Sequence, residues 1–391
     1  MMIEVHARLP HGSVFLAGEV VECHISFRSP FTYSQKQSQY NSNLEEVLAW
    51  ASAQIHCQCT VDDTLVKFPS TASQEELATA SQDTSFIPCR GESGHVVLST
   101  KPKILFCDLK LSPGESKTYI YRETIPNNAP PSYRGQCVKY AYKITVGTQR
   151  VNAVIKLLKI PIRVLVLYGV PDAQYFADSE ELQVAPANPF LQSQQKQPTI
   201  SSTLQMLEAI TARRSPSYYN ITNQSGKVVR FCLLKSSYRL GEDIIGVFDF
   251  TQGTVKCVQF SVTLISEEEL QEDCKGRAKQ SIATVAYNKH HEFSLHLNLT
   301  QVILPIPLTV TPAFSTNIVS LKWKLHFEFV TSNTVSPMPK STNPSECVSW
   351  QGPASLDVQT MIWDLPIDVY PTHPLQVAHG LPSKLDHMIT I

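Results

Sequence analysis

The sequence has little charge and almost no charge imbalance. Only 17% of its 391 residues are charged, below the usual quarter, and 33 basic residues stand against 34 acidic ones. Nucleic acids and anionic membrane surfaces both attract dense clusters of lysine and arginine. The sequence therefore predicts no nucleic-acid partner, and we expect any membrane contact to be indirect.

Long hydrophobic runs are also missing. The longest apolar stretch, around residues 160–170, contains Pro161 and Arg163, which argue against a membrane-spanning helix. The first ten residues, MMIEVHARLP, lack the basic region and apolar core of a secretory signal. Ten scattered cysteines are typical of free thiols in a reducing compartment. Together these features predict a cytosolic protein.

Motifs for catalysis are absent from the sequence. It contains no Gly-x-Ser-x-Gly elbow, no Gly-x-x-x-x-Gly-Lys-Ser/Thr loop and no His-Glu-x-x-His zinc helix. Cys57 and Cys59, with Cys23 or His24, could form a metal cluster, but a two-residue spacing in an alternating strand favours core packing. We therefore predict no catalytic, cofactor-binding or metal-binding residues.

What the sequence does contain is an internal repeat. The segment from Ile125 to Val146 aligns without a gap on the segment from Ile306 to Phe327, at a constant offset of 181. Both segments end in alternating apolar residues, the pattern of a half-buried strand. A second pair of segments, residues 13–27 and 236–250, aligns at an offset of 223 and carries a Gly-Glu turn in each copy. Two further strand blocks recur in the same order.

Four repeated strand blocks in one order predict an all-β protein made of two tandem β-sandwiches. We expect an N-terminal sandwich over residues 1–168, a linker over 169–225 and a C-terminal sandwich over 226–371. The apolar spacing of Thr199 to Arg213 predicts a short helix within the linker. Residues 372–391 are expected to form a flexible tail. Polar stretches at residues 28–46, 69–95 and 331–355 are expected to be exposed insertions.

Some charged and aromatic residues are candidates for partner binding. Glu267 to Glu269, with Glu272 and Asp273, could meet a basic partner or form a solvated loop, which is the commoner outcome. Trp50 follows a polar stretch and is a candidate interface residue. The remaining candidates are expected to have structural or solvent-exposed positions: Trp323 and Trp363 in the core, His290 and His291 in solvent.

The segment Pro130 to Tyr133, PPSY, fits the pattern that WW domains of ubiquitin ligases recognise. Here, however, the motif enters a strand and recurs as Thr311 to Phe314 in the second copy. We therefore favour a structural role for this motif.

Several of these segments together resemble a known family. Paired Gly-Glu turns, a Pro-Gly-Glu turn and a closing Ile-Pro-Ile strand are similar to the arrestin-like fold over nearly the whole chain. The match is closer to the Rgp family, the smaller subunits of the two-subunit Ric/Rgp guanine-nucleotide exchange complex. The segments that carry this resemblance are KPKILFCDLKLSPGESK (101–117), PPSYRGQCVKYAYKITVG (130–147), VSLKWKLHFEFVTS (319–332) and WDLPIDVYP (363–371).

The resemblance implies two tandem arrestin-like sandwiches and a function. With a larger Ric-type partner, such a subunit promotes GDP release and GTP loading on a Golgi Rab GTPase of the Rab-six kind, supporting retrograde traffic from endosomes. It implies a cytosolic protein, recruited peripherally to the Golgi membrane, that is not an enzyme by itself. No family residue is carried over as catalytic, and the partner-binding residues stay unknown. The alternative is an α-arrestin-like adaptor that links membrane cargo to a ubiquitin ligase.

Overall fold

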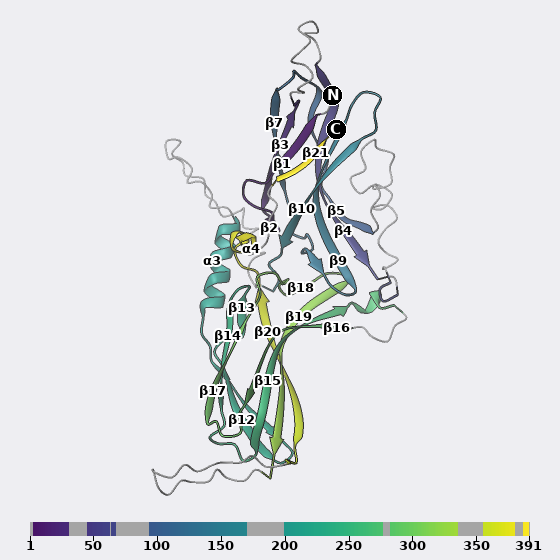
Figure 1. Cartoon of the computed structure of the whole chain (residues 1–391). Helices are drawn as coiled ribbons and strands as arrows, with labels where there is room; N and C mark the ends of the chain where they lie inside the picture. The colour runs from purple at the N-terminus through teal and green to yellow at the C-terminus, as the bar shows by residue number, and fades with distance from the viewer. Residues whose placement is uncertain are drawn as a thin grey trace, which may run out of the picture.

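The computed structural model shows two β-sandwiches stacked end to end in an elongated molecule (Figure 1). Both chain termini lie at the far end of the first sandwich (Figure 1). The structure describes residues 3–30, 45–62, 64–67, 94–169, 199–276, 282–334, 355–379 and 386–390. Most of each of the three polar insertions expected from the sequence lies outside these described residues.

The N-terminal sandwich consists of two sheets. One has the strand order β21-β1-β3-β7, and the other has the order β2-β10-β9-β4-β5, with β6 also paired to β4 and β8 to β9. Among these described strands every pair is antiparallel except β2 with β10, which run parallel. The strands are β1 (Glu4–Arg8), β2 (Val14–Leu16), β3 (Val20–Arg28), β4 (Glu46–Val61), β5 (His95–Ser99), β6 (Lys103–Leu111), β7 (Ser116–Thr124), β8 (Tyr133–Arg134), β9 (Val138–Gln149), β10 (Lys156–Leu165) and β21 (Asp386–Thr390).

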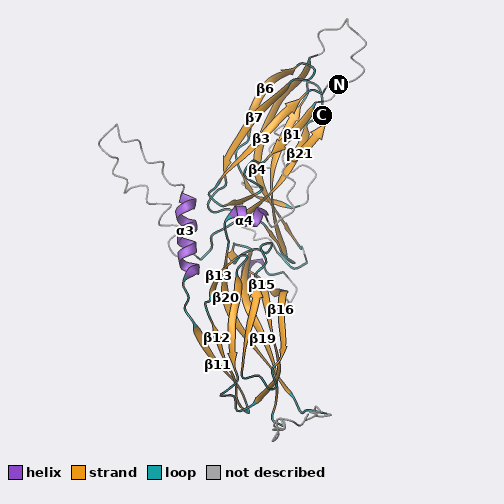
Figure 2. Cartoon of the chain, turned by 60° about the vertical axis from the view of Figure 1, so that its left-hand side comes forward, coloured by secondary structure: helices purple, strands orange, loops and turns teal. Residues whose placement is uncertain are grey.

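The C-terminal sandwich repeats this plan. Its smaller sheet has the order β11-β12-β14-β17, and its larger sheet the order β13-β20-β19-β15-β16, with β18 paired to β19. Figure 2 shows the two sandwiches in profile, with the helix α3 (Thr199–Ala212) alongside. The strands are β11 (Ser217–Asn223), β12 (Gly226–Leu233), β13 (Ser237–Arg239), β14 (Asp243–Asp249), β15 (Lys256–Leu270), β16 (Ile282–Phe293), β17 (Leu299–Pro305), β18 (Phe314–Ser315), β19 (Val319–Ser332) and β20 (Gln359–Tyr370).

The repeat predicted from the sequence is confirmed by matching hydrogen bonds. In the first copy, the amide of Gly18 donates to the carbonyl of Ile125 at 2.8 Å, and the amide of Ile125 donates to the carbonyl of Glu19 at 3.0 Å. β8 and β18 begin at positions separated by the expected 181 residues, as do β9 and β19. The equivalent bonds in the second copy run from Gly241 to Ile306 and from Ile306 to Glu242, at 3.0 and 2.9 Å.

The alternation of apolar residues places one row of each strand in a core. In β9, the predicted inward residues from Val138 to Val146 are all buried, and in β19 so are Trp323 and Leu325. Complete burial of a large apolar side chain contributes about 1.5–3 kcal/mol. The N-terminal core also extends into the second sandwich, because it includes Phe314 and Val319.

The structure differs from the sequence prediction at both ends of the C-terminal sandwich. β11 lies within the predicted linker. It forms a strand there because Tyr219 and Ile221 face the core while the residues next to them in the sequence face outward. The predicted flexible tail instead contains a short helix, α4 (Pro374–His379), and the strand β21, which pairs with β1. Buried Val377 anchors α4. Such a short anchored segment carries too weak a periodicity to be recognised from the sequence.

The Gly-Glu turns generate a prediction about stability. Gly241 has a φ of +84°, and a Cβ atom there would lie 2.8 Å from Cδ2 of Leu308. We expect Gly241→Ala to lower the free energy of unfolding by about 1–2 kcal/mol from the left-handed backbone, with a further cost from the contact. Equilibrium denaturation measures this change.

Gly169 supplies the matched control for that substitution. Its φ is +74°, but among the described residues, apart from its own chain neighbours, no heavy atom lies within 4 Å of a Cβ built there. Gly169→Ala should therefore lose less stability than Gly241→Ala, because it carries backbone strain alone. Equal losses in the two variants would show that the contact with Leu308 adds nothing.

Candidate functional site at the junction of the two sandwiches

The two repeated strand entries, β8 and β18, meet at the junction of the sandwiches. The rings of Tyr133 and Phe314, which are equivalent positions of the repeat, pack edge to face with centroids 5.0 Å apart. The hydroxyl of Thr311 donates to the carbonyl of Ser132 at 3.3 Å. The junction is therefore built from the same segment of each copy, facing its counterpart.

A buried carboxylate ties the two copies together. Glu268, at the end of β15, is 3% exposed and crosses the junction. Its oxygens accept hydrogen bonds from the amides of Gln136 at 2.7 Å, Cys137 at 3.2 Å and Val138 at 3.0 Å. Converging amides form a favourable site for an anion, and each bond to a charged acceptor contributes more than a neutral one.

The repeat explains why this carboxylate comes from the other sandwich. In the second copy, the hydroxyl of Thr316 accepts the amides of Ile318 at 3.3 Å and Val319 at 3.1 Å. The equivalent of Thr316 in the first copy is Gly135, which has no side chain. A Cβ atom at Gly135 would lie 2.4 Å from Oε1 of Glu268. Glycine at this position thus leaves room for the carboxylate.

A second polar contact crosses the junction from β10. The guanidinium of Arg163 donates to the carbonyls of Leu308, Thr309 and Val310, at 3.4, 3.1 and 2.8 Å. Burial lowers the pKa of Arg163 from its usual value. Because these carbonyls belong to the second sandwich, Arg163 connects the two sandwiches through contacts separate from those of Glu268.

A third connection joins two loops by backbone bonds. The amide of Lys67 donates to the carbonyl of Cys274 at 2.8 Å, and the amide of Gly276 donates to the carbonyl of Leu65 at 2.9 Å. Val66 and Lys275 form an antiparallel bridge between them. Besides the contacts of Glu268 and Arg163, this bridge joins the two sandwiches at a third place.

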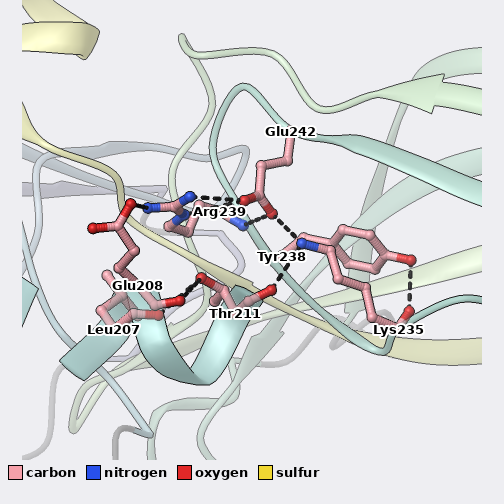
Figure 3. Close-up of polar contacts among 7 residues, drawn as sticks. All are labelled: Leu207, Glu208, Thr211, Lys235, Tyr238, Arg239 and Glu242. Atoms are coloured by element: carbon pink, nitrogen blue, oxygen red, sulfur yellow. Dashed lines mark hydrogen bonds and ion pairs between the residues drawn. The ribbon is translucent and has the colours of Figure 1, made fainter. Parts of the chain in front are cut away.

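The helix α3 is held against the second sandwich by the polar group in Figure 3. The ammonium of Lys235 donates to the last-turn carbonyl of Thr211 at 3.0 Å and to Glu242 at 2.7 Å. A cation at a helix C-terminus is stabilising. Arg239 lies between Glu242 and the helix residue Glu208 (Figure 3). Burial opposes ionisation of Glu242, but the bonds from Lys235 and Arg239 hold its pKa below the usual value.

The outer face of the larger C-terminal sheet carries a ladder of ion pairs. Lys324 contacts both Glu267 and Asp364, and His326 lies 2.6 Å from Asp364. Lys322 extends the ladder through its pair with Glu269. Glu267 to Glu269 were expected to form a loop more often than not, but they continue β15 instead, with half-buried Glu267 and Glu269 paired and Glu268 buried. Glu272 and Asp273 lie beyond β15 in a short 3-10 helix. This face is therefore not an unpaired acidic surface for a basic partner.

The PPSY motif has the structural position that the repeat predicts. Pro131 is buried and Tyr133 is 9% exposed. The carbonyl of Pro130 accepts the hydroxyl of Tyr142 at 2.7 Å, and the hydroxyl of Ser132 accepts the amide of Val164 at 2.9 Å. A WW domain reads an extended, accessible motif. The adaptor hypothesis therefore loses its best sequence feature.

The cysteine and histidine candidates also have structural positions. Cys23, Cys57 and Cys59 are buried, and burial raises the pKa of Cys23 and Cys59 to about 12. Among the residues that the structure describes, no group of three metal-ligating side chains is suited to a metal ion. Both histidines lie on β16; His291 is exposed, as predicted, whereas His290 is half-buried.

The tryptophans are divided between core and edge. Trp323 is buried, and Trp363 is partly buried against the same core, as predicted. Trp50 is half-buried, and its ring NH donates to the side chain of Gln149 at 2.8 Å.

Within the described part of the chain, no helix is long and apolar enough to cross a membrane.

Sequence reasoning missed the residues that make the junction. Glu268 looked like part of a solvated acidic run, although the alternation of Val262 and Leu264 continues through it to Leu270. That continued alternation would have placed Glu268 on the inward face. The mismatch of Gly135 with Thr316 in the repeat was the second available signal.

The carboxylate of Glu268 generates a prediction about the junction. Glu268→Gln removes the charge from a buried acceptor of three amides. We expect it to lower the free energy of unfolding by about 2 kcal/mol. Gly135→Ala should act in the same direction, because its Cβ would displace that carboxylate. Urea denaturation of each variant measures the change.

The adjacent Glu269 is the matched control for that experiment. Its carboxylate is 35% exposed and pairs with Lys322, itself 64% exposed. Exposed pairs contribute little, so Glu269→Gln should change stability by less than about 1 kcal/mol. If both glutamine variants had the same stability, the proposed role of Glu268 would be wrong.

The ion-pair ladder predicts a dependence of stability on pH. Burial opposes ionisation of Asp364, but hydrogen bonds from Lys324 and His326 outweigh it and hold its pKa below the usual 3.8. A lowered pKa adds stability above the unfolded value, and this contribution is lost as the pH falls through the folded value. Stability should therefore decline below about pH 4.

Asp364→Asn should flatten part of this decline, since the variant has no carboxylate to protonate. Chemical denaturation of both proteins between pH 3 and 7 measures the two slopes. Parallel slopes below pH 4 would contradict the role of Asp364.

Comparisons with known proteins agree on one family. A family model described as Rgp1 matches residues 92–184 and 176–332. The RAB6A-GEF complex partner protein 2 of Homo sapiens is 45% identical over 400 residues, covering 100% of both chains. The protein of the same name from Bos taurus is 45% identical over 382 residues, covering 95% of each chain. The repeat, the two sandwiches and this full-length similarity lead to one conclusion: the chain belongs to the Rgp1 family.

Proposed function

We propose that this chain is the smaller subunit of a two-subunit guanine-nucleotide exchange factor for a Golgi Rab GTPase of the Rab-six kind. With a larger Ric-type subunit it promotes GDP release and GTP loading, and so supports retrograde traffic from endosomes to the Golgi. The observation that carries the proposal is the 45% identity, over the full chain, to a protein named as a partner in a RAB6A-GEF complex.

Nucleotide exchange is compatible with a sequence that contains none of the catalytic motifs considered above. An exchange factor accelerates GDP release by binding the nucleotide-poor GTPase more tightly than the GDP-bound form. Its binding energy displaces the switch segments that hold the nucleotide and its magnesium ion. Such work needs a firm binding surface rather than a nucleophile or an acid–base pair. The chain is therefore not an enzyme by itself in this proposal.

The junction supports this proposal because it joins the two sandwiches at several points. Contacts of Glu268, Arg163 and the Val66–Lys275 bridge hold the two sandwiches in one arrangement. A preorganised surface spends less binding energy on ordering itself, which leaves more for distorting the GTPase. In the proposal the protein is cytosolic and reaches the Golgi membrane peripherally, through its partners.

Release of a fluorescent GDP analogue from the Rab GTPase tests the proposed function. We expect the two subunits together to accelerate release by at least about tenfold over either subunit alone. The matched control is an unrelated Rab GTPase, whose GDP release should stay at its intrinsic rate. Full activity of the larger subunit without this chain would contradict a required role for it, and so would full activity of this chain alone.

A further inference from the structure

The connector between α3 and β11 contains a serine that is directly followed by proline. It consists of Arg213, Arg214, Ser215 and Pro216, all of which are exposed. Within the described part of the chain, the side chains of these residues make no hydrogen bond or ion pair. Proline restricts the residue before it to extended backbone, so Ser215 lies on an extended and accessible segment.

Proline-directed protein kinases accept a serine whose next residue is proline. The sequence has three other Ser-Pro pairs, at Ser29, Ser112 and Ser336. Ser29 is 2% exposed, and Ser112 lies in a turn closed by the carboxylate of Glu115, which accepts the amide of Ser112 at 2.9 Å. Ser336 lies outside the described residues. Among the described Ser-Pro pairs, Ser215 alone is both exposed and outside a hydrogen-bonded turn.

Cations lie close to the hydroxyl of Ser215. Arg213 and Arg214 precede it directly in the sequence. Lys235 comes from β12's side of the sheet, because the antiparallel pairing of β11 with β12, continued by two residues beyond Ser217, brings Ser215 opposite Lys235. A phosphate group has three oxygens that accept strong hydrogen bonds from arginine and lysine. These side chains therefore suit a phosphate on Ser215.

Lys235 is also the cation that holds the end of α3 (Figure 3). Its ammonium contacts the carbonyl of Thr211 at 3.0 Å and the carboxylate of Glu242 at 2.7 Å. A phosphate carries a charge of about −1.5 to −2, so it attracts this ammonium more strongly than a neutral carbonyl does. Moving Lys235 to the phosphate takes a cation from the helix C-terminus and leaves a new negative charge near it. Both changes destabilise the last turn of α3.

We propose that Ser215 is a phosphorylation site for a proline-directed kinase, and that its phosphate loosens α3 from the second sandwich by engaging Lys235. In the reaction, the hydroxyl oxygen of Ser215 bonds to the γ-phosphorus of ATP as the γ-phosphoanhydride bond breaks. ADP leaves, and the hydroxyl proton passes to a base of the kinase. The inference is independent of the proposed function, because it depends on contacts within this chain alone.

Phosphorylation of the full chain in vitro tests the site. Proline-directed kinases of the cyclin-dependent and mitogen-activated classes supply the phosphate from ATP, and fragment mass spectrometry locates it. We expect a phosphate on Ser215 and none on Ser112, which is the matched control because Glu115 closes its turn. Ser215→Ala should remove the phosphate from this peptide. Absence of phosphate from Ser215 in the unaltered chain would overturn the proposal.

Hydrogen–deuterium exchange then tests the effect on α3. We expect phosphorylation to speed exchange of the amides of residues 209–212 by about tenfold, because the last turn opens more readily. The amides of β19, at the centre of the same sandwich, are the internal control and should be unchanged. Unchanged exchange in α3 after phosphorylation of Ser215 would overturn the proposal.

A variant of Lys235 separates the proposed mechanism from a general effect of added charge. Lys235→Met should speed exchange of residues 209–212 without any phosphate, because the helix C-terminus loses its cation. Phosphorylation of this variant should then add less than about twofold, since the two changes act through the same ammonium. An equal tenfold effect of phosphorylation in both proteins would show that Lys235 has no part in it, and would overturn the proposal.

Discussion

The structure depends on one buried set of hydrogen bonds, which the amides of residues 136–138 donate to the carboxylate of Glu268. A buried charge is costly unless its hydrogen-bonding capacity is met, and here three donors from the other sandwich meet it. Moving the sandwiches apart would break these hydrogen bonds together and replace them with bonds to water. The contact therefore sets the geometry of the whole molecule, and the contacts of Arg163 and the Val66–Lys275 bridge reinforce it.

Duplication followed by divergence accounts for this contact. Each copy needs an acceptor for the amides at the entry to its long strand. The second copy uses its own Thr316, whereas the first has Gly135 and takes the acceptor from its neighbour. Because the two copies differ in this one side chain, the acceptor lies within the same turn in the second copy but comes from the other sandwich in the first. The Gly-Glu turns, in contrast, keep the same hydrogen bonds in both copies.

The same geometry suits a protein that acts by binding. The described chain has paired charges on the outer face of its larger C-terminal sheet, and most of its described thiols are buried, although Cys107 is exposed. Belonging to the Rgp1 family is consistent with such a role, and the proposed exchange function makes use of it.

The sequence by itself determined the all-β class, the repeat and the inward row of each main strand, because period-two alternation and an ungapped offset are local properties. It also predicted α3 and the structural position of the PPSY motif. Only the tertiary structure decided that Glu268 is buried at a junction, that β21 returns to pair with β1, and that Lys235 contacts the end of α3. Each of these depends on which distant segments meet, and the side-chain pattern of a single strand carries no information about its neighbours.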